Sequence, residues 1–435
     1  MKKRLKTIAV IVCTAVCALT LPACAKSILL GKPRDLSKEF ISENREELSF
    51  GDFVLKIDEF SSAFASSVYA VYDKTDNFAV SPISAFMALA LASECAGGRT
   101  RTEILNALDF THEQMLAYIP RLYKTLNTEY KDGFTVKHTL KLANSVWINE
   151  GTKVKQECID ALSDYYLSYS YSADFKNGNK DANDAVRRFV KKRTKGLVDV
   201  KFELPEQTIF TLINTLYLKT LWNNYGDELP FTDKKYVFKQ SDGTAKDINL
   251  LQGYYFSGRV RSAETYSTFF TEPIGGYRIK FIVPRDGYNI GEVFTGQTVS
   301  NVNSLTDYGG VDDVNKIRYY TRCLFPEFKA SFNGEIKEVL KTKFKINSLF
   351  DENDCDFSTL TDDYAYCNEV RHIADLTVNK KGIEGAAVTY IPGAGAAGPD
   401  EYTEVYEDFT VDKSFGFIIT DYQNIALFSG VVNKV

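Results

Sequence analysis

The chain has 435 residues, a formal net charge of −5 and 44% hydrophobic residues, which is the composition of a soluble globular protein. Its mild acidity gives no sign of the positive charge that a nucleic-acid surface needs, so we expect no nucleic-acid partner. The 30 Phe and 26 Tyr can fill a large apolar core, and a disulfide framework is not needed at this size.

The N-terminus has the pattern of an export signal. A positively charged start, Lys2 to Lys6, precedes an uncharged run over residues 8–20 that is too short to span a bilayer comfortably. The next four residues, Leu21-Pro22-Ala23-Cys24, resemble the lipobox of bacterial lipoproteins, in which the chain is cut before the cysteine and the new terminus is acylated.

From this pattern we predict a signal peptide over residues 1–23, a lipid on Cys24, and a lipid-anchored tether over residues 24–51. The protein would then be secreted and held on the surface of a bacterial cell membrane. Ordinary secretion, with cleavage within the small-residue run Ala23-Cys24-Ala25, is the alternative.

Few residues of the mature chain could carry catalysis or bind a metal. Five cysteines follow Cys24 at wide, irregular spacing with no C-x-x-C pair, so neither zinc nor a redox dithiol is indicated. Only His112, His138 and His372 are available as imidazole bases, and no G-x-S-x-G elbow occurs. We therefore expect no catalytic site, no metal and no cofactor, and we interpret His372 as a buried structural residue.

Residues 52–435 contain no linker and no repeat, and we predict that they form one domain. Apolar residues at helical spacing predict helices in the first half, and β-rich stretches predict strands in the second half. The predicted helices are 82–96, 102–108 and 183–195, and the predicted strands are 278–283, 373–378, and a hairpin of 415–420 with 425–432. This order predicts an α+β fold with a largely antiparallel sheet.

Two patterns suggest other activities. Residues 393–398 match the G-x-G-x-x-G motif, but Pro392 precedes them, Pro399 follows them, and no helix begins there to hold a pyrophosphate. We interpret them as an exposed loop. The segment from Arg187 to Lys195 holds six basic residues in nine positions, which is either a solvated helix face, our prediction, or a polyanion site.

Four segments, in chain order, carry a family resemblance: 77–105, 142–148, 212–222 and 428–433. They resemble the serpins, the serine protease inhibitor superfamily, and the resemblance as a whole covers nearly all of residues 55–435. The resemblance implies the serpin fold, with helices, three largely antiparallel sheets and an exposed reactive-centre loop.

A fifth segment, 378–389, resembles the hinge of that loop. In the family a protease attacks the loop as a substrate and is trapped as an acyl-enzyme when the hinge inserts into the main sheet as a new strand. The resemblance therefore implies a monomeric suicide inhibitor that forms a covalent complex with a serine protease, and not an enzyme. The implied hinge residues are Gly382, Ile383, Glu384, Gly385, Ala386, Ala387, Val388 and Thr389.

The hinge residues suit insertion in most respects. Alternation along a strand places Ile383 toward a core and leaves Glu384 in solvent. We expect residues 382–391 to be solvated in the intact protein. Two departures can hinder insertion, because Ile383 is bulky for the first inserting position and Pro392 has no N–H for a sheet ladder.

Two further departures are Lys380 and Lys381, which stand where family hinges usually carry acidic residues. These departures keep open a second function, that of a non-inhibitory serpin acting as a surface binding protein.

The position of the scissile bond follows from the hinge. Counting fifteen residues from Gly382 places it at Ala396–Ala397, which suits elastase-like or subtilisin-like proteases with a small apolar primary pocket. Counting back from Ser414 points nearer to Tyr402–Thr403. We favour the first bond, because insertion length is what the mechanism constrains.

The resemblance also implies a structural cluster beneath the opening sheet, where hydrogen bonds would hold together the strands that part. Its expected members are Ser81, Ser84, Asn214, Trp222 and His372.

Overall fold

The computed structural model describes residues 27–35, 48–72, 76–133, 135–196, 198–222, 228–367, 370–383 and 402–435. Its helices are α1 Phe50–Val71, α2 Pro82–Cys95, α3 Gly98–Leu108, α4 His112–Thr125, α5 Gln156–Asp164, α6 Asn179–Arg193, α7 Ile290–Val293, α8 Gly296–Asn303, α9 Lys337–Thr342 and a 3-10 turn over Ser348–Phe350.

The strands are distributed over the whole described chain. They are β1 Ile28–Gly31, β2 Phe78–Val80, β3 Asn127–Asp132, β4 Thr135–Asn149, β5 Ser168–Ala173, β6 Phe210–Leu221, β7 Tyr236–Lys239, β8 Ala245–Ile248, β9 Leu251–Ser257, β10 Arg261–Ser262, β11 Tyr266–Thr271, β12 Arg278–Pro284, β13 Val311–Asp312, β14 Ile317–Phe325, β15 Phe328–Glu335, β16 Arg371–Asn379, β17 Gly382–Ile383, β18 Thr403–Thr410, β19 Phe415–Thr420 and β20 Ala426–Val432.

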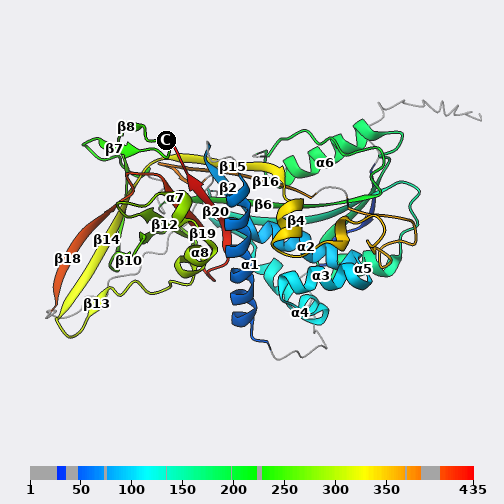
Figure 1. Cartoon of the computed structure of the whole chain (residues 1–435), viewed down its shortest axis with the longest axis horizontal. Helices are drawn as coiled ribbons and strands as arrows, with labels where there is room; N and C mark the ends of the chain where they lie inside the picture. Colours follow the sequence, from blue (N-terminus) through cyan, green and yellow to red (C-terminus); the bar gives the residue numbers. More distant parts are fainter. Residues whose placement is uncertain are drawn as a thin grey trace, which may run out of the picture.

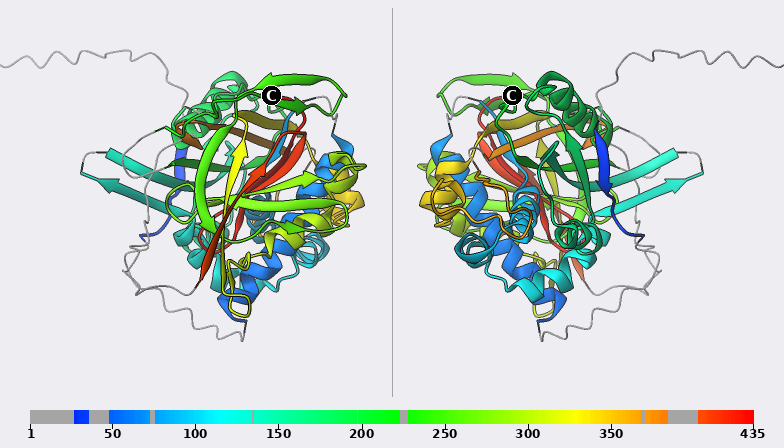
Figure 2. Two further views of the ribbon diagram at one scale, coloured as in Figure 1. Left: turned by 90° about the vertical axis from the view of Figure 1, so that its left-hand side faces the viewer. Right: turned by 90° about the vertical axis from the view of Figure 1, so that its right-hand side faces the viewer.

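A long mixed sheet runs through the molecule, with helices packed against it (Figure 1). Within the described residues its strand order is β1-β5-β4-β6-β17-β16-β15-β2-β20-β19-β12-β11-β10, and the β3–β4 hairpin projects from the side of the body (Figure 2). A small sheet places β14 between β9 and β18, with β13 at its tip, and β7 pairs with β8. Most neighbouring strands are antiparallel, so the predicted α+β class is confirmed.

Helix α2 lies at the centre of the core. Its sequence is apolar on every side, which is typical of a helix with no solvated face, and it packs against α1, α3, β6 and β20. Helix α1 begins at Ser49, whose side chain accepts a hydrogen bond from the Asp52 N–H, and buries Phe53, Ile57 and Phe64 on one face. The predicted helices over 82–96, 102–108 and 183–195 correspond to α2, α3 and α6.

The helices predicted in the first half are present, but the periodicity of the sequence did not predict two of the longest strands, β4 and β6, which begin there. Strand β4 does not show simple alternation, since both of its faces are covered. Ala143 and Trp147 pack beneath α6, and Leu142 and Val146 enter the main core. A strand buried on both faces lacks the polar positions that alternation requires.

Part of the predicted tether is also a strand. Residues Ile28–Gly31 form β1, which pairs antiparallel with β5 at the outer edge of the long sheet, while Cys24 lies outside the described residues. Polar flanking residues favoured a tether, but an apolar triplet beside an unpaired sheet edge forms a strand, because the edge offers free N–H and C=O groups.

Candidate functional site: the loop hinge and its position in the sheet

The hinge enters the long sheet as β17. Gly382 and Ile383 pair antiparallel with Asn379 and Val378 of β16 on one side, and with Leu221 and Thr220 of β6 on the other. The Ile383 side chain is 0% exposed and belongs to the main core. The expectation of a solvated hinge is therefore wrong for its first two residues, and Ile383 faces the core as its strand parity predicted.

The entry into this position requires glycine. Gly382 has a φ of +154°, and a Cβ atom there would lie 2.1 Å from the carbonyl oxygen of Thr220. The residue follows a tight turn over Lys380 and Lys381, which brings the chain back beside β16. Any side chain at 382 would push β17 away from β6.

Acidic partners compensate the two lysines that depart from the family pattern. The Lys380 ammonium lies 2.5 Å from one carboxylate oxygen of Glu228, and Lys381 lies 3.8 Å from the other. The Lys380 N–H donates to Glu327 at 2.7 Å, and the hydrogen bond from the Lys380 side chain lowers the pKa of Glu228. Neither glutamate was predicted from the sequence, although two lysines in the hinge turn indicate acidic partners.

Trp222 fixes the same end of the sheet. Its indole N–H donates to the Asn379 carbonyl at 2.6 Å, its ring packs against Phe325 at a centroid distance of 5.5 Å, and the side chain is buried. The indole therefore ties the end of β6 to the last residue of β16, directly beside the hinge turn.

Beyond the end of β17, the two strands that flank the hinge, β6 and β16, are not paired with each other. Strand β6 pairs with β4 along its length but with β17 only at Thr220 and Leu221, and β16 pairs with β15 along its length but with β17 only at Val378 and Asn379. Among the described residues, no strand occupies the remaining position between them. Backbone groups along this position are those that an inserted strand would bind.

Ser81, Ser84 and His372 come together beneath the sheet, as expected. The Ser81 N–H donates to His372 Nε2 at 3.0 Å, and the Ser81 hydroxyl donates to that of Ser84 at 3.0 Å. Because Nε2 accepts a bond, the neutral ring carries its proton on Nδ1. Burial among Phe64 and Phe332 lowers the pKa of His372 to about 4, so the ring is neutral at physiological pH.

Asn214 and Trp222 do not join that group. The Asn214 amide donates to Asn144 Oδ1 on β4 at 2.6 Å, and Asn144 in turn donates to the Tyr166 carbonyl at 2.8 Å. The expected single cluster is divided because Asn214 lies on β6 and His372 on β16. These two strands are not paired with each other, and β17 lies between them at one end.

The remaining predicted site residues lie outside the described residues. They are the hinge residues Glu384, Gly385, Ala386, Ala387, Val388 and Thr389, the reactive-bond residues Ala396 and Ala397, and the lipidation residue Cys24. The described ends of this segment are Ile383 in the long sheet and Tyr402, which precedes β18 of the small sheet.

The other two histidines have partners that do not suit a hydrolase. His112 Nε2 lies 2.7 Å from the Glu94 carboxylate, and His138 Nδ1 lies 3.3 Å from the Tyr277 hydroxyl. His372 binds the backbone of Ser81 and not its hydroxyl, so it cannot activate that serine as a nucleophile. A search of the described residues finds no group of side chains that could hold a metal, and no helix long and apolar enough to cross a bilayer.

The basic segment, which lies on α6 and the turn after it, is paired in part. Arg187 and Lys191 each lie 2.6 Å from Asp199, and the Arg193 guanidinium stacks 4.3 Å from the Tyr169 ring centre. Lys195 lies 3.7 Å from Glu129. These contacts reduce the charge available to a polyanion, which favours the solvated helix face.

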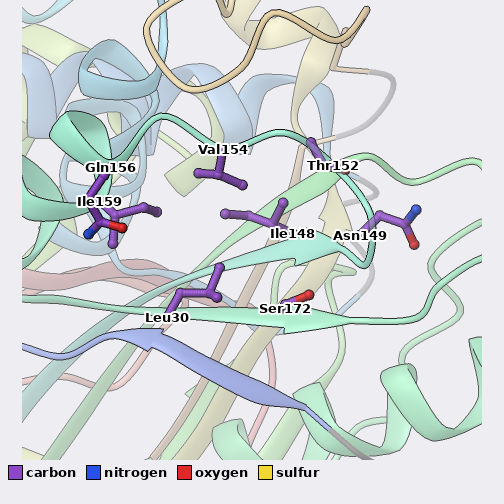
Figure 3. Close-up of a pocket in the computed structure, with 8 residues that line it drawn as sticks. All are labelled: Leu30, Ile148, Asn149, Thr152, Val154, Gln156, Ile159 and Ser172. Carbon is purple, nitrogen blue, oxygen red and sulfur yellow. The ribbon is translucent and has the colours of Figure 1, made fainter.

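A pocket of about 250 Å³ lies at the far edge of the long sheet, between β1, β4, β5 and α5 (Figure 3). Leu30 closes it on the side of β1, opposite Ile148 and Ile159. Its lining holds no ionisable side chain, so it offers no acid or base that could activate the hydroxyls of Thr152 and Ser172.

Comparisons with known proteins agree with this geometry. A family model described as Serpin (serine protease inhibitor) matches residues 57–435. Alpha-1-antiproteinase S of Cavia porcellus is 24% identical over 382 residues, which cover 85% of this chain and 88% of that protein. The thermophilic serpin tengpin in its native state has a TM-score of 0.71 at 21% identity, covering 94% of this chain and 100% of that one. Human thyroxine-binding globulin complexed with its hormone has a TM-score of 0.69 at 21% identity, covering 89% and 99% of the two chains, so the solved structures show a shared fold.

Proposed function

The chain belongs to the serpin family of serine protease inhibitors, and from that premise we propose that it is a suicide inhibitor that traps its target protease by loop insertion. One observation carries the proposal. The hinge already begins a strand between β6 and β16, and the rest of that position holds no strand among the described residues. Residues that follow Ile383 can extend β17 only along this position.

The proposed reaction begins as ordinary proteolysis. The serine hydroxyl of the protease attacks the carbonyl carbon of Ala396, the bond to the Ala397 nitrogen breaks, and the new amine takes up the proton. The protease is then an ester on Ala396. Once the loop is cut, residues 384–391 are free to continue β17 and to carry the ester with them, before water hydrolyses it.

The side chain at 396 should set the class of target. Alanine suits a small apolar primary pocket, so we propose elastase-like or subtilisin-like proteases as targets. Arginine at the same position, Ala396→Arg, should redirect inhibition to trypsin, whose primary pocket holds a carboxylate. A trypsin reaction that stays as slow as in the wild type would contradict the assignment of Ala396.

A non-inhibitory binding protein is the second candidate, and one observation favours it. Ile383 is fully buried in the core, and Lys380 holds the hinge turn to Glu228, so the hinge can be a finished structural element. Thyroxine-binding globulin complexed with its hormone shares this fold. In that function, cleavage of the loop would release the protease.

Incubation with pancreatic elastase separates the two functions. An inhibitor gives a complex that resists boiling in SDS, at close to one inhibitor per protease, and mass spectrometry of the released C-terminal peptide should show Ala397 as its first residue. Cleaved chain without a complex would overturn inhibition. A peptide that begins at Thr403 would move the reactive bond to Tyr402–Thr403.

We further propose that the mature protein is a monomer held on the membrane surface by a lipid on Cys24. Strand β1 begins four residues later and packs against α5, at the end of the molecule opposite β13 and the start of β18 (Figure 1). An anchor there would direct the loop away from the membrane. Metabolic labelling with palmitate should mark the wild type and not Cys24→Ser, and equal labelling would contradict the proposal.

A further inference from the structure

The outer face of the small sheet carries a row of tyrosines across three strands. Tyr406 of β18 stacks on Tyr320 of β14 at a centroid distance of 5.1 Å and an angle of 16°, and it meets the ring of Tyr255 of β9 edge-on at 5.1 Å. Tyr406 is 55% exposed and Tyr255 is 40% exposed. We call Tyr255, Tyr320 and Tyr406 the tyrosine face.

The opposite face of the same sheet is core. Thr321, Cys323 and Phe409 alternate with the exposed residues and are buried. The tyrosines therefore belong to a sheet whose opposite face is packed against the core. They point to solvent because successive side chains of a strand alternate between the two faces.

Polar contacts hold the tyrosine face in place. Arg322 makes two hydrogen bonds to Asp408, at 2.7 and 3.3 Å, and its guanidinium lies 5.0 Å from the Tyr255 ring centre. The Tyr406 hydroxyl donates to Glu404 at 2.8 Å. Side chains ordered in advance lose little conformational entropy on binding, and tyrosine and arginine are enriched where protein partners bind tightly.

The tyrosine face lies beside the reactive segment. Strand β18 directly follows Tyr402, the first described residue after that segment, and Figure 2 shows β18 next to β14 at this end of the molecule. Only six residues, 397–402, separate the reactive bond from β18. Even fully extended they reach about 20 Å.

A protease bound to the loop lies close to this surface. A domain of ~240 residues has a radius of gyration of about 18 Å, comparable with the whole reach of the connecting segment. The body of the protease must therefore rest against or next to the small sheet while its active site holds Ala396.

We propose that the tyrosine face is a second contact surface for the attacking serine protease. During formation of the initial complex, the tyrosine face binds the rim of the active site of the protease. This inference rests on the proposed function. The partner must offer apolar or hydrogen-bonding groups at that rim, because the charge of Arg322 is already neutralised by Asp408. Contact there should accelerate association and leave the later insertion step unchanged, since the hinge lies in the other sheet.

The test uses the full chain with Tyr320→Thr and Tyr406→Thr combined, since threonine keeps the preference for a strand. The matched control is Tyr364→Thr, which alters a 65% exposed tyrosine that precedes β16 and is not part of the small sheet. The measurements are the second-order rate constant of association with pancreatic elastase, the stoichiometry of inhibition, and kcat/KM for cleavage of the loop. The thermal midpoint of each intact variant confirms folding.

We expect the double variant to associate at least tenfold more slowly at unchanged stoichiometry, and the control to behave as the wild type. An association rate within twofold of the wild type would overturn the tyrosine face alone. If the wild type is cleaved without forming a complex, the proposed function fails, and kcat/KM still reports on the surface: an equal value in the double variant overturns it, and a tenfold loss supports it.

Discussion

Ile383 was expected to hinder insertion, but the structure shows it as a buried core residue. Its size suggested an obstacle at the first inserting position, but the structure buries it completely between β6 and β16. Burial of an isoleucine side chain contributes up to about 3 kcal/mol. A bulky residue therefore stabilises the first step of insertion in a position that is already open.

Ile383→Arg tests this interpretation. An unpaired charge in the core costs several kcal/mol, so β17 should leave the sheet and insertion should fail. The loop should still be cut, because the reactive bond is unchanged, and the protein should behave as a substrate of elastase. Ile383→Val is the matched control and should inhibit normally. Trapping by the arginine variant at the stoichiometry of the wild type would contradict the role of β17.

His372 should make the stability of the protein depend on pH. Its pKa in the folded state is about 4, below the value of about 6.5 in an unfolded chain. The unfolded chain therefore takes up a proton first as pH falls, and the contribution that is complete above pH ~6.5 is lost as the pH drops toward 4. Between pH 7.5 and 5.0 this amounts to about 2 kcal/mol.

Urea unfolding of the wild type and of His372→Gln at both pH values would measure that loss. Buried Asp58 and Asp421 also titrate anomalously, but they are common to both proteins, so the difference isolates the imidazole. We expect the wild type to lose about 2 kcal/mol more than the variant over this range. Equal losses would show that His372 is not buried in its neutral form.

At the scale of the elements, the turn between β16 and β17 depends on the ion pair between Lys380 and Glu228, in which lysine stands where family hinges usually carry an acidic residue. Lys380→Glu should place a carboxylate against Glu228 and beside Glu327, and Glu228→Lys should place three ammonium groups together. Each single change should lower the thermal midpoint of the intact protein, and the double change should restore most of it. Because both side chains are about 40% exposed, the coupling should stay below about 1 kcal/mol and shrink in salt.

A double-mutant cycle at low ionic strength would give this coupling directly. Additive effects of the two single changes would show that the pair does not hold the hinge turn. Lys413, which pairs with exposed Asp286 in another part of the molecule, provides the matched control, and its reversal should leave the coupling between positions 380 and 228 unchanged.

The sequence predicted elements well where one face of the element is solvated. The stripe of α6 shows helical periodicity, and the structure confirms the helix. The β19–β20 hairpin, which is buried at every position of both strands, was predicted instead from its β-forming residues and the polar turn between them, and the structure confirms it too. Strand β4 was not predicted from its pattern, because burial on both faces removes the polar positions that alternation requires. Strand β1 was missed because its pairing depends on β5, more than a hundred residues away, and no local signal reports a vacant sheet edge.

The site was predicted only in part, because some of its contacts depend on how distant segments come together in the fold. Contacts within one side of the sheet, such as Ser81 with His372, followed from the family pattern. The division of Asn214 from His372 did not, because it depends on whether the position between β6 and β16 is open. Glu228 was missed because its partner Lys380 is brought to it by the hairpin and not by spacing in the sequence.

For the whole molecule, the proposed function requires that the intact fold is not the most stable arrangement of the chain. The long sheet contains a strand position that β17 occupies only at one end. Extending β17 gains ladder hydrogen bonds worth about 1 kcal/mol each, but ordering each residue costs a similar amount. The gain on insertion must therefore come mainly from relief of the open sheet, whose flanking strands bind no neighbour along most of that position within the described chain.

Thermal unfolding followed by circular dichroism, before and after limited elastase digestion, tests this claim most directly. Mass spectrometry would first confirm a single cut between residues 393 and 403. An ordinary domain cut in an exposed loop keeps its stability or loses some of it. We predict that the cut protein unfolds at a much higher temperature than the intact protein, because residues 384–391 complete the sheet. An unchanged or lower midpoint after cleavage would leave the fold as described and contradict the inhibitory mechanism.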